Sequence, residues 1–533
     1  MILRKASIRR FGARFGHARV SGPRPTGRRR AQNGRERHTA GHGPAKSRGM
    51  HDTTPSGSPS HRSRTWVHAP RRAWRLAALM AAALPMGAMS QVQTEPAEPP
   101  IRFSLDGGAQ FIAERDPFWG LAQQFAPDAA YPRSFHWLEV FVKPSLTARY
   151  PLGSGMTAYG GVSLYATGTI EEDVFVQGNT GRLEIEDAYL GLRGEADGWR
   201  WDVSAGAQSY RLGHGFLLAS GAGNGFERGA AVTAPRRAWR MAGVARATAG
   251  PWTAEAFYVD PNELESGDTG TRLWGVLGQW APVEGASLGL AHLRVNASSA
   301  PYPKAPLTII EGGRDGLQTT DLIWTFEPRS GALAGLSFTG EAAWQRNERI
   351  QLKANGYGMD LGWRLAQVRF TPKISWSYRR FSGDVPETPD RLERFDPLFY
   401  DGAPPTWSSG SNGSFAFYNS NLVVHRLRAD LVLSPRDFAN LSWWKVNADQ
   451  ANSPVQYGQA ARLTVTEGGV VLVTGFPSRA LTQELYAEYT RVLSPRLFFT
   501  AGVAGAIPRD GIKALVPDAR SWWGVLGNVS FKF

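Results

Sequence analysis

The chain has 533 residues, 42% of them hydrophobic, and a mean hydropathy of −0.31, which excludes a helical membrane protein; the absence of cysteine excludes disulfides and cysteine metal sites. The net charge of +14 comes from the N-terminal region, because residues 1–90 carry 19 of the 60 Lys and Arg and two of the 46 Asp and Glu. Residues 91–533 therefore hold 41 basic and 44 acidic side chains, so the basicity does not indicate a nucleic-acid partner.

Residues 1–49 are rich in Arg, Gly and Pro and show no hydrophobic periodicity. They have two interpretations: a disordered basic arm, or sequence upstream of a true start at Met50 or later. Residues 50–90 form a signal-peptide region, in which arginines precede a short apolar run and Ala88-Met89-Ser90 provides a cleavage site. We therefore expect export, a mature start near Gln91, and a Pro/Glu-rich linker over residues 91–100.

Residues 368–381 show most clearly the pattern that organises the rest of the chain. Every second side chain is apolar or aromatic, and the side chains between them are polar or cationic. Such alternation describes a β-strand whose two faces meet different surroundings. A tilted strand of about 9–11 residues crosses a bilayer, so the stretch fits a transmembrane strand with lipid outside and an aqueous, cationic lumen inside. A long strand of a soluble sandwich is the alternative.

The same alternation, bounded by turn residues, predicts eighteen strands after the linker. They cover residues 101–113, 134–150, 156–170, 182–195, 199–213, 237–248, 252–260, 271–282, 286–297, 317–328, 332–346, 356–365, 368–381, 422–433, 438–447, 481–493, 497–506 and 521–533. Residues 463–474 have two interpretations, a further hairpin or part of a loop.

The lengths of the predicted links decide between barrel and sandwich. Links after even-numbered strands have 2–5 residues, whereas links after odd-numbered strands have 9–40. Short periplasmic turns and long outer loops at opposite ends are typical of outer-membrane barrels, and a sandwich has no reason to sort its loops in this way. We therefore predict an all-β fold over residues 101–533: a closed antiparallel transmembrane β-barrel of about 18 strands, with short periplasmic turns and long extracellular loops.

The last predicted strand ends at Phe533, on the same face as Trp523, Val525, Val529 and Phe531. A terminal Phe on an alternating strand resembles the signal by which outer-membrane barrels are recognised for insertion by the barrel assembly machinery. The expected location is the bacterial outer membrane, with lipid around a barrel that has no open edge.

The more polar face of each strand is assigned to the lumen, because Arg or Lys at mid-strand on the lipid face would cost about 2–4 kcal/mol. The strands that flank the longest loop concentrate positive charge, and low-dielectric walls make such a patch attract anions. The candidate pore-lining residues are Arg240, Arg246, Arg369, Lys373, Arg379, Arg426, Arg428, Asp187, Glu341 and Glu484. Structural salt bridges across the lumen are the alternative role for such residues.

Short motifs spread over residues 180–490 resemble the alginate export family of outer-membrane channels. The most specific pairing is Ser382-Gly383-Asp384 with Phe395-Asp396-Pro397-Leu398-Phe399 in the loop after the strand at 368–381. Weaker matches are residues 206–208, 212–218, 340–345 and 483–485, and Ala207 and Tyr486 depart from the family pattern. The resemblance implies an 18-stranded barrel that passes an acidic exopolysaccharide through an electropositive constriction formed with loop segments.

We expect neither an enzyme nor a cofactor, because no motif for either is present. Outside the leader, His136, His214, His292 and His425 fall on different strands or loops without metal-ligand spacing. The Gly-rich stretch 218–225 lacks the Lys-Ser/Thr of a phosphate loop, and we expect it to be a loop that folds inward.

Three functions stay open. The first is a passive conduit for an anionic, alginate-like polyuronate, whose interspersed acidic residues keep binding weak enough for release. The second is an uptake porin for small organic anions. The third is a structural or adhesive barrel whose loop at 384–421 binds partners. Any periplasmic scaffold that serves the first function would be a separate chain.

Overall fold

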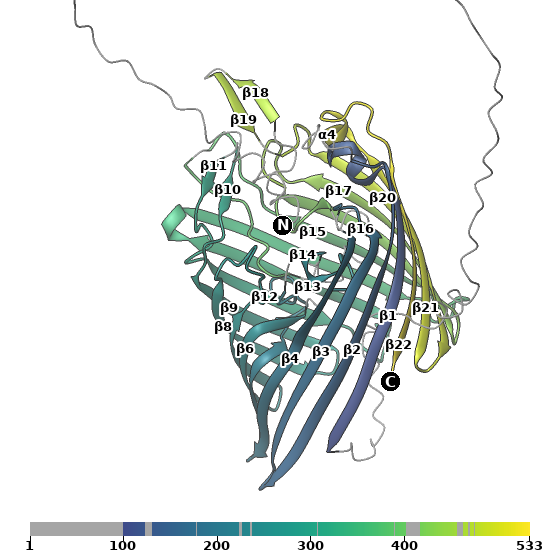
Figure 1. The fold of residues 1–533 in the computed structure, drawn as a ribbon. Helices are drawn as coiled ribbons and strands as arrows, with labels where there is room; N and C mark the ends of the chain where they lie inside the picture. The colour runs from purple at the N-terminus through teal and green to yellow at the C-terminus, as the bar shows by residue number, and fades with distance from the viewer. Residues whose placement is uncertain are drawn as a thin grey trace, which may run out of the picture.

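The fold is built from backbone hydrogen bonds between strands that follow one another in the sequence. The computed structural model describes residues 100–122, 131–176, 178–222, 226–234, 237–305, 308–388, 390–400, 416–455, 462–466, 469–473 and 475–533. An 18-stranded antiparallel sheet closes on itself where β1 (Ile101–Arg115) pairs with β22 (Trp522–Lys532) (Figure 1). The predicted fold class is thus confirmed. The predicted arm, signal peptide and nearly all of the linker lie outside the described residues.

The other barrel strands follow in chain order around the bore. They are β2 (Ser134–Gly153), β3 (Met156–Glu172), β4 (Gly178–Ala196), β5 (Trp199–Ser209), β6 (Ala238–Ala249), β7 (Trp252–Asp260), β8 (Arg272–Val283), β9 (Ala286–Ala297), β12 (Gln318–Phe326), β13 (Leu336–Asn347), β14 (Leu352–Arg364), β15 (Lys373–Phe381), β16 (Leu422–Ser434), β17 (Asp437–Ala448), β20 (Ala480–Ser494) and β21 (Leu497–Pro508).

The seam between first and last strands is paired along its length. Ten residue pairs join β1 to β22, and Leu105 and Phe533 exchange two backbone hydrogen bonds of 3.0 Å beyond them. At the opposite end of the seam, the Trp522 indole N–H donates to the Glu114 carboxylate. Because hydrocarbon offers no hydrogen-bond partners, this closure is what permits the sheet to stand in a bilayer.

Side chains alternate between the outside of the barrel and its bore. On β14 and β15, Leu361 and Ile374 are 46% and 47% exposed, while Asp360 and Ser377 are buried. In a closed barrel, large apolar side chains left exposed can only face outward, so the buried polar set faces the bore. Lys373 and Arg379 have the same parity as Ser377 and lie on the bore side, as the alternation in the sequence predicts.

Exposed tryptophans mark both ends of the outward face. Trp199, Trp252, Trp280 and Trp363 lie near the short turns, and the rings of Trp252 and Trp280 are 6.2 Å apart. Trp274, Trp344 and Trp523 lie at the opposite end of the barrel. Two such belts, with an apolar band between them, match the two interfaces of a bilayer.

Two of the short links are longer than predicted, and two of the long links are shorter: the β3–β4 link covers 173–177 rather than 171–181, and the β13–β14 link covers 348–351 rather than 347–355. The β12–β13 link covers 327–335 rather than 329–331, and the β14–β15 link covers 365–372 rather than 366–367. Phe370 and Thr371 adopt positive φ angles of 67° and 38°, which end an extended chain, and Pro372 has no N–H to donate to a ladder. The strand predicted at 368–381 therefore begins at Lys373.

Four further strands lie outside the barrel sheet. β10 (Tyr302–Lys304) pairs with β11 (Thr308–Ile310), and β18 (Arg462–Thr466) pairs with β19 (Gly469–Val473). The second pair shows that residues 463–474 contain a separate hairpin rather than extra barrel strands. The helical turns of the described residues include η3 (Pro117–Gly120), η4 (Phe226–Arg228), η5 (Glu348–Ile350) and α4 (Asp510–Lys513). Across the described part of the chain, no helix has the length and apolar character needed to traverse a membrane.

We expect Leu290→Arg, at the middle of the outward face of β9, to lower the free energy of unfolding in phospholipid vesicles by about 2–4 kcal/mol. Leu290 is 56% exposed in the structure, where only lipid would contact it. Leu333→Arg in the β12–β13 link is the matched control, with an expected change below about 1 kcal/mol because it lies near the interface. Denaturant titration measures both; equal effects would contradict the assignment of the outward face.

Candidate functional site

One long loop crosses the bore. Residues 210–222 and 226–234, here called the first inner loop, connect β5 to β6. At one wall, Thr169 of β3 donates to the Gly229 carbonyl at 2.8 Å. At another wall, the His214 N–H donates to Glu341 of β13, and the His214 Nε2 lies 3.1 Å from the Trp324 carbonyl oxygen of β12. Strands β2–β3 and β12–β13 are separated by six strands in one direction and eight in the other, so the loop spans the lumen.

Glu139 of β2 fixes the first inner loop to the wall. Its fully buried carboxylate accepts the backbone N–H groups of Ala231, Val232 and Thr233 at 3.0, 3.1 and 2.8 Å. It also accepts the Trp137 indole N–H at 2.9 Å. A buried carboxylate is costly unless donors surround it, and successive backbone N–H groups provide such a nest. Strand and loop therefore stabilise each other at this point.

A second loop enters from β15 and joins the first. Residues 382–388 and 390–400 are here called the second inner loop. The Phe399 N–H donates to the Leu217 carbonyl at 3.0 Å, and the Phe399 carbonyl accepts from Ala219 and Ser220 at 2.9 and 3.0 Å. The two loops thus run side by side, with a parallel bridge between Leu218 and Phe399. Residues 218–222 lie inside the barrel, as expected for the Gly-rich stretch.

Aromatic packing closes the space between the inner loops and the wall. The Phe216 ring lies 5.2 Å from that of Phe381 and 6.0 Å from that of Phe395, and all three side chains are fully buried. This cluster is an apolar core inside the bore. It gives the predicted motif residue Phe395 a packing role.

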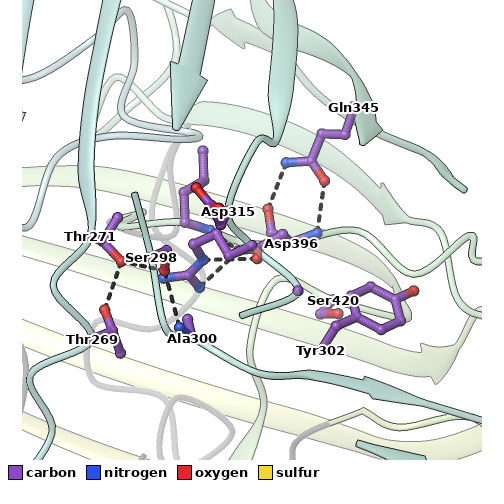
Figure 2. A network of polar contacts seen from close by, with 12 residues as sticks. Thr269, Thr271, Ser298, Ala300, Tyr302, Asp315, Gln345, Asp396 and Ser420 are labelled. Atoms are coloured by element: carbon purple, nitrogen blue, oxygen red, sulfur yellow. Dashed lines mark hydrogen bonds and ion pairs between the residues drawn. The ribbon is translucent and has the colours of Figure 1, made fainter. Parts of the chain in front are cut away.

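Asp396 of the same motif is held by an arginine and a glutamine. Arg314, from the β9–β12 connection, forms two hydrogen bonds of 2.9 Å with its carboxylate. Gln345 of β13 donates to the Asp396 carbonyl and accepts from its N–H, both at 2.8 Å (Figure 2). Burial alone would raise the pKa of Asp396, but the Arg314 guanidinium and the Leu398 N–H lower it below its ordinary value. The carboxylate is therefore charged at neutral pH.

The Ser382-Gly383-Asp384 motif also holds the second inner loop in place. Asp384 accepts from the Tyr302 hydroxyl and from the Glu393 and Arg394 N–H groups at 2.7, 2.8 and 2.9 Å. Burial raises the pKa of Tyr302 well above its ordinary value, so its hydroxyl remains a donor. At Gly383, any Cβ atom would collide with the Asn421 side chain, which explains why glycine stands there.

The bore face of β15 and β16 carries the predicted cations. Arg379 Nη2 lies 2.6 Å from Asp360 Oδ2 on β14, and Arg426 Nη2 lies 3.6 Å from the other Asp360 oxygen. Both arginine side chains are 2% exposed, and the Arg426 guanidinium stacks 5.0 Å from the Trp444 ring centre. One carboxylate thus serves two buried guanidinium groups.

Lys373 and Arg428 are the more accessible members of this wall. Arg428 is 31% exposed and forms a 2.7 Å hydrogen bond with Asp430, while Lys373 stands opposite Asp430 in the ladder. Arg369, in contrast, is not on a strand: it lies in the β14–β15 link, with its guanidinium 4.5 Å from the Phe370 ring centre. Its placement on the lumen face of a strand was wrong, because the positive φ of Phe370 breaks the alternation.

The remaining predicted residues lie at several places around the bore. Arg246 bonds to Glu255 of β7, whereas Arg240 reaches Asp268 at 3.2 Å at the loop end of β6. Asp187 holds Lys143 at 2.8 Å, Glu341 receives the first inner loop, and Glu484 is buried on β20. Ser382, Pro397 and Leu398 belong to the second inner loop, where Ser382 Oγ donates to the Glu393 carbonyl at 2.6 Å.

Sequence reasoning missed the partners that hold the inner loops. Arg314 and Tyr302 stand in irregular connections, where no periodicity singles them out. Glu139 and Asp360 appear on polar faces of predicted strands, but parity alone does not tell which side chains meet across a lumen. The sequence did contain one signal for these contacts, namely the two family motifs at 340–345 and 395–399. The hydrogen bonds between Gln345 and Asp396 join these motifs.

The arrangement is that of a channel. Within the described ranges, no group of three or more His, Asp or Glu side chains is placed to hold a metal ion. The family model for alginate export matches residues 181–445, the part that contains both inner loops and the cationic wall. Over this stretch, which is just under half of its length, the chain matches the alginate export family. It is an outer-membrane β-barrel channel, and both fold and family indicate transport rather than catalysis.

Among solved structures, the chain is similar to several proteins at low sequence identity. OccK5 (OpdH) of Pseudomonas aeruginosa is 9% identical with a TM-score of 0.49, covering 81% of this chain and 98% of that one. OpdQ of the same organism is 10% identical with a TM-score of 0.48, covering 82% and 99%. OccAB3 of Acinetobacter baumannii is 11% identical with a TM-score of 0.48, covering 81% and 99%. No curated protein matches the chain in sequence.

We expect Glu139→Ala to release the first inner loop, because three backbone N–H groups lose their acceptor. The free energy of unfolding should fall by roughly 1–3 kcal/mol, and the single-channel conductance should rise. Planar-bilayer recordings and denaturant titration measure the two effects. Glu172→Ala, at the exposed end of β3, is the control with wild-type behaviour. An unchanged conductance in Glu139→Ala would show that the loop keeps its place without this anchor.

The Asp396–Arg314 pair sets a pH dependence. Because the pKa of Asp396 is lowered in the folded protein, its contribution is fully present above the ordinary value of 3.8 and is lost as pH falls through the lowered pKa. The Leu398 N–H, which donates to Asp396 at 2.9 Å, should keep its hydrogen-exchange protection from pH 7 to about 4, after correction for intrinsic exchange.

The Asp396→Asn variant should lose that protection throughout the same pH range. Asp390→Asn, an exposed position of the same loop, should retain it. Wild-type protection in Asp396→Asn would mean that the ion pair does not order the motif.

Proposed function

We propose that the chain is a passive outer-membrane conduit for an anionic exopolysaccharide of the alginate-like, polyuronate class. The observation that supports this most directly is the bore face of β15 and β16. It carries Lys373, Arg379, Arg426 and Arg428 against two carboxylates, Asp360 and Asp430. An excess of cations on a wall with low-dielectric surroundings attracts anions from both openings.

The wall has two kinds of cation: buried ones that contribute only their charge, and accessible ones that can bind and release an anion. Arg379 and Arg426 are buried and held by Asp360, so they contribute charge without being available for direct binding. Lys373 and Arg428 reach the solvent of the bore, and an incoming carboxylate competes with Asp430 for the Arg428 guanidinium. Weak, competitive binding of this kind is what repeated uptake and release along a polymer requires.

A second candidate is an uptake porin for small organic anions. The two inner loops and their aromatic cluster narrow the bore, which favours permeants smaller than a polymer. The two candidates share the same cationic wall, and they differ in whether an extended polyuronate enters the bore. A separate periplasmic scaffold chain would accompany the first and has no part in the second.

Planar-bilayer recordings test the proposal. In a KCl gradient the wild-type channel should prefer chloride, and alginate added on the side of the short turns should block the current. Arg428→Ala removes one accessible cation, and we expect it to weaken the alginate block about two- to fivefold, as for the loss of one exposed ion pair. Arg329→Ala, paired with Glu284 at the short turns, is the matched control.

Cation selectivity of the wild-type channel would contradict the proposal. A channel that prefers chloride and carries small organic anions but is indifferent to alginate would favour the uptake porin. Arg379→Ala is less informative than Arg428→Ala, because breaking a buried pair typically costs about 3–5 kcal/mol and would disturb the barrel itself.

A further inference from the structure

A hollow in the lumen wall lies nearly opposite the cationic wall. It has a volume of about 440 Å³ and is lined by residues of β2 to β5, among them Lys143, Tyr159, Asp187, Tyr189 and Gln208. This volume falls in the range of roughly 300–1,000 Å³ typical of small-ligand sites. Strands β2–β5 and β15–β16 are on different sides of the barrel order, with seven strands between β5 and β15 in one direction.

Two tyrosine rings line this hollow, and glycines on the neighbouring strand leave room for them. Tyr189 of β4 stands opposite Gly161 of β3, and Tyr159 of β3 stands opposite Gly191 of β4. A Cβ atom at Gly161 would lie 2.9 Å from Tyr189 Cε1, and one at Gly191 would overlap the Tyr159 ring. Each ring therefore covers the space above its glycine, and each tyrosine keeps part of its surface exposed.

The two rings are neighbours in an edge-to-face arrangement, with their planes inclined by 66°. Their centres are 6.3 Å apart, and the Arg193 guanidinium lies 5.8 Å from the Tyr159 ring centre. The Tyr159 hydroxyl donates to Asp202 of β5, which fixes the ring from the side. Neither ring belongs to the buried core of the inner loops, and both keep partial exposure.

Polar groups border the rings. Lys143 Nζ lies 2.8 Å from Asp187 and 3.2 Å from Glu186, and Ser163 Oγ donates to Asp187 at 2.6 Å. Because two carboxylates already hold this lysine, the hollow has no excess of positive charge and is a poor trap for a free anion. It offers aromatic faces beside carboxylate, ammonium and hydroxyl groups.

We propose that this hollow is a pyranose-stacking subsite for the sugar rings of the transported polysaccharide, with Tyr159 and Tyr189 as its platforms. One face of a pyranose ring presents C–H groups, which suit the negative face of an aromatic ring, and its edge presents hydroxyls. Asp187 and Lys143 are placed to accept from and donate to those hydroxyls. The inference rests on the proposed function, and it adds that one wall attracts the carboxylates while the other holds the rings.

This division of roles between the two walls predicts how the channel responds to charged and to neutral sugars. The cationic wall distinguishes charged from neutral sugars, whereas the tyrosine subsite binds both, since ring stacking does not depend on a carboxylate. A neutral β-1,4-linked cello-oligosaccharide is therefore a probe for the subsite alone, and alginate oligosaccharides probe both walls together.

The test compares current block by the two probes in planar bilayers, using the full-length channel. Tyr159→Leu/Tyr189→Leu should weaken block by both probes about tenfold. The control Tyr258→Leu replaces a tyrosine on the outward face of β7 and should leave block unchanged. Arg428→Ala should weaken block by the alginate probe only. If the double variant does not insert, Tyr189→Val alone is measured, with a smaller loss expected for both probes.

Wild-type affinity for both probes in the tyrosine variants would overturn the subsite while leaving the proposed function intact. The same holds if the cello-oligosaccharide fails to block the wild-type channel and alginate still does. Absence of alginate block in the wild-type channel overturns the proposed function instead, whatever the tyrosine variants show.

Discussion

The structure depends on one requirement: no backbone N–H or C=O group may remain unpaired in hydrocarbon. The pairing of β1 with β22 meets it, since it turns an 18-stranded sheet with two edges into a cylinder with none. Closure also fixes the surroundings of every side chain. Successive side chains along a strand face lipid and bore in turn. The alternation visible in the sequence is therefore a direct consequence of the closed sheet.

A cylinder of this size creates a second problem, which is solved inside it. Eighteen strands enclose a wide bore. The first inner loop enters it after β5, and the second enters it after β15. Each loop is held by buried carboxylates that accept hydrogen bonds from backbone N–H groups. Glu139 and Glu341 accept from the first inner loop, and Asp384 accepts from the second. Loops without a sheet of their own thus obtain their hydrogen bonds from strand side chains and from their own turns.

The sequence predicted the barrel well because its signal is local and repeated. Alternation recurs in every hairpin and the link-length pattern in most of them, so an error in one element leaves the others intact. The error at 365–372 has a local cause as well: Val368 and Phe370 continue the alternation, but Phe370 and Thr371 adopt positive φ angles that alternation does not encode. Arg369 was misplaced with them.

The interior could be predicted only in part, because its contacts join segments far apart in the chain. Gln345 meets Asp396 across 51 residues, and His214 meets Glu341 across 127. The resemblance to the alginate export family marked these segments as motifs, although nothing in their spacing indicated that they touch. Arg314, which completes the Asp396 site, lies outside every motif and became visible only through its two hydrogen bonds.

The distribution of charge inside the bore follows from the same requirement that buried polar groups have partners. Buried guanidinium groups need a carboxylate nearby, and Asp360 supplies one for both Arg379 and Arg426. This sharing leaves a net positive wall without leaving a deep, unpaired cation that would hold an anion tightly. On the opposite wall, Lys143 lies between two carboxylates and adds no such attraction. A polymer in the bore would therefore meet a shallow field on one side and aromatic faces on the other, and shallow contacts repeated along its length are the condition for moving rather than stopping.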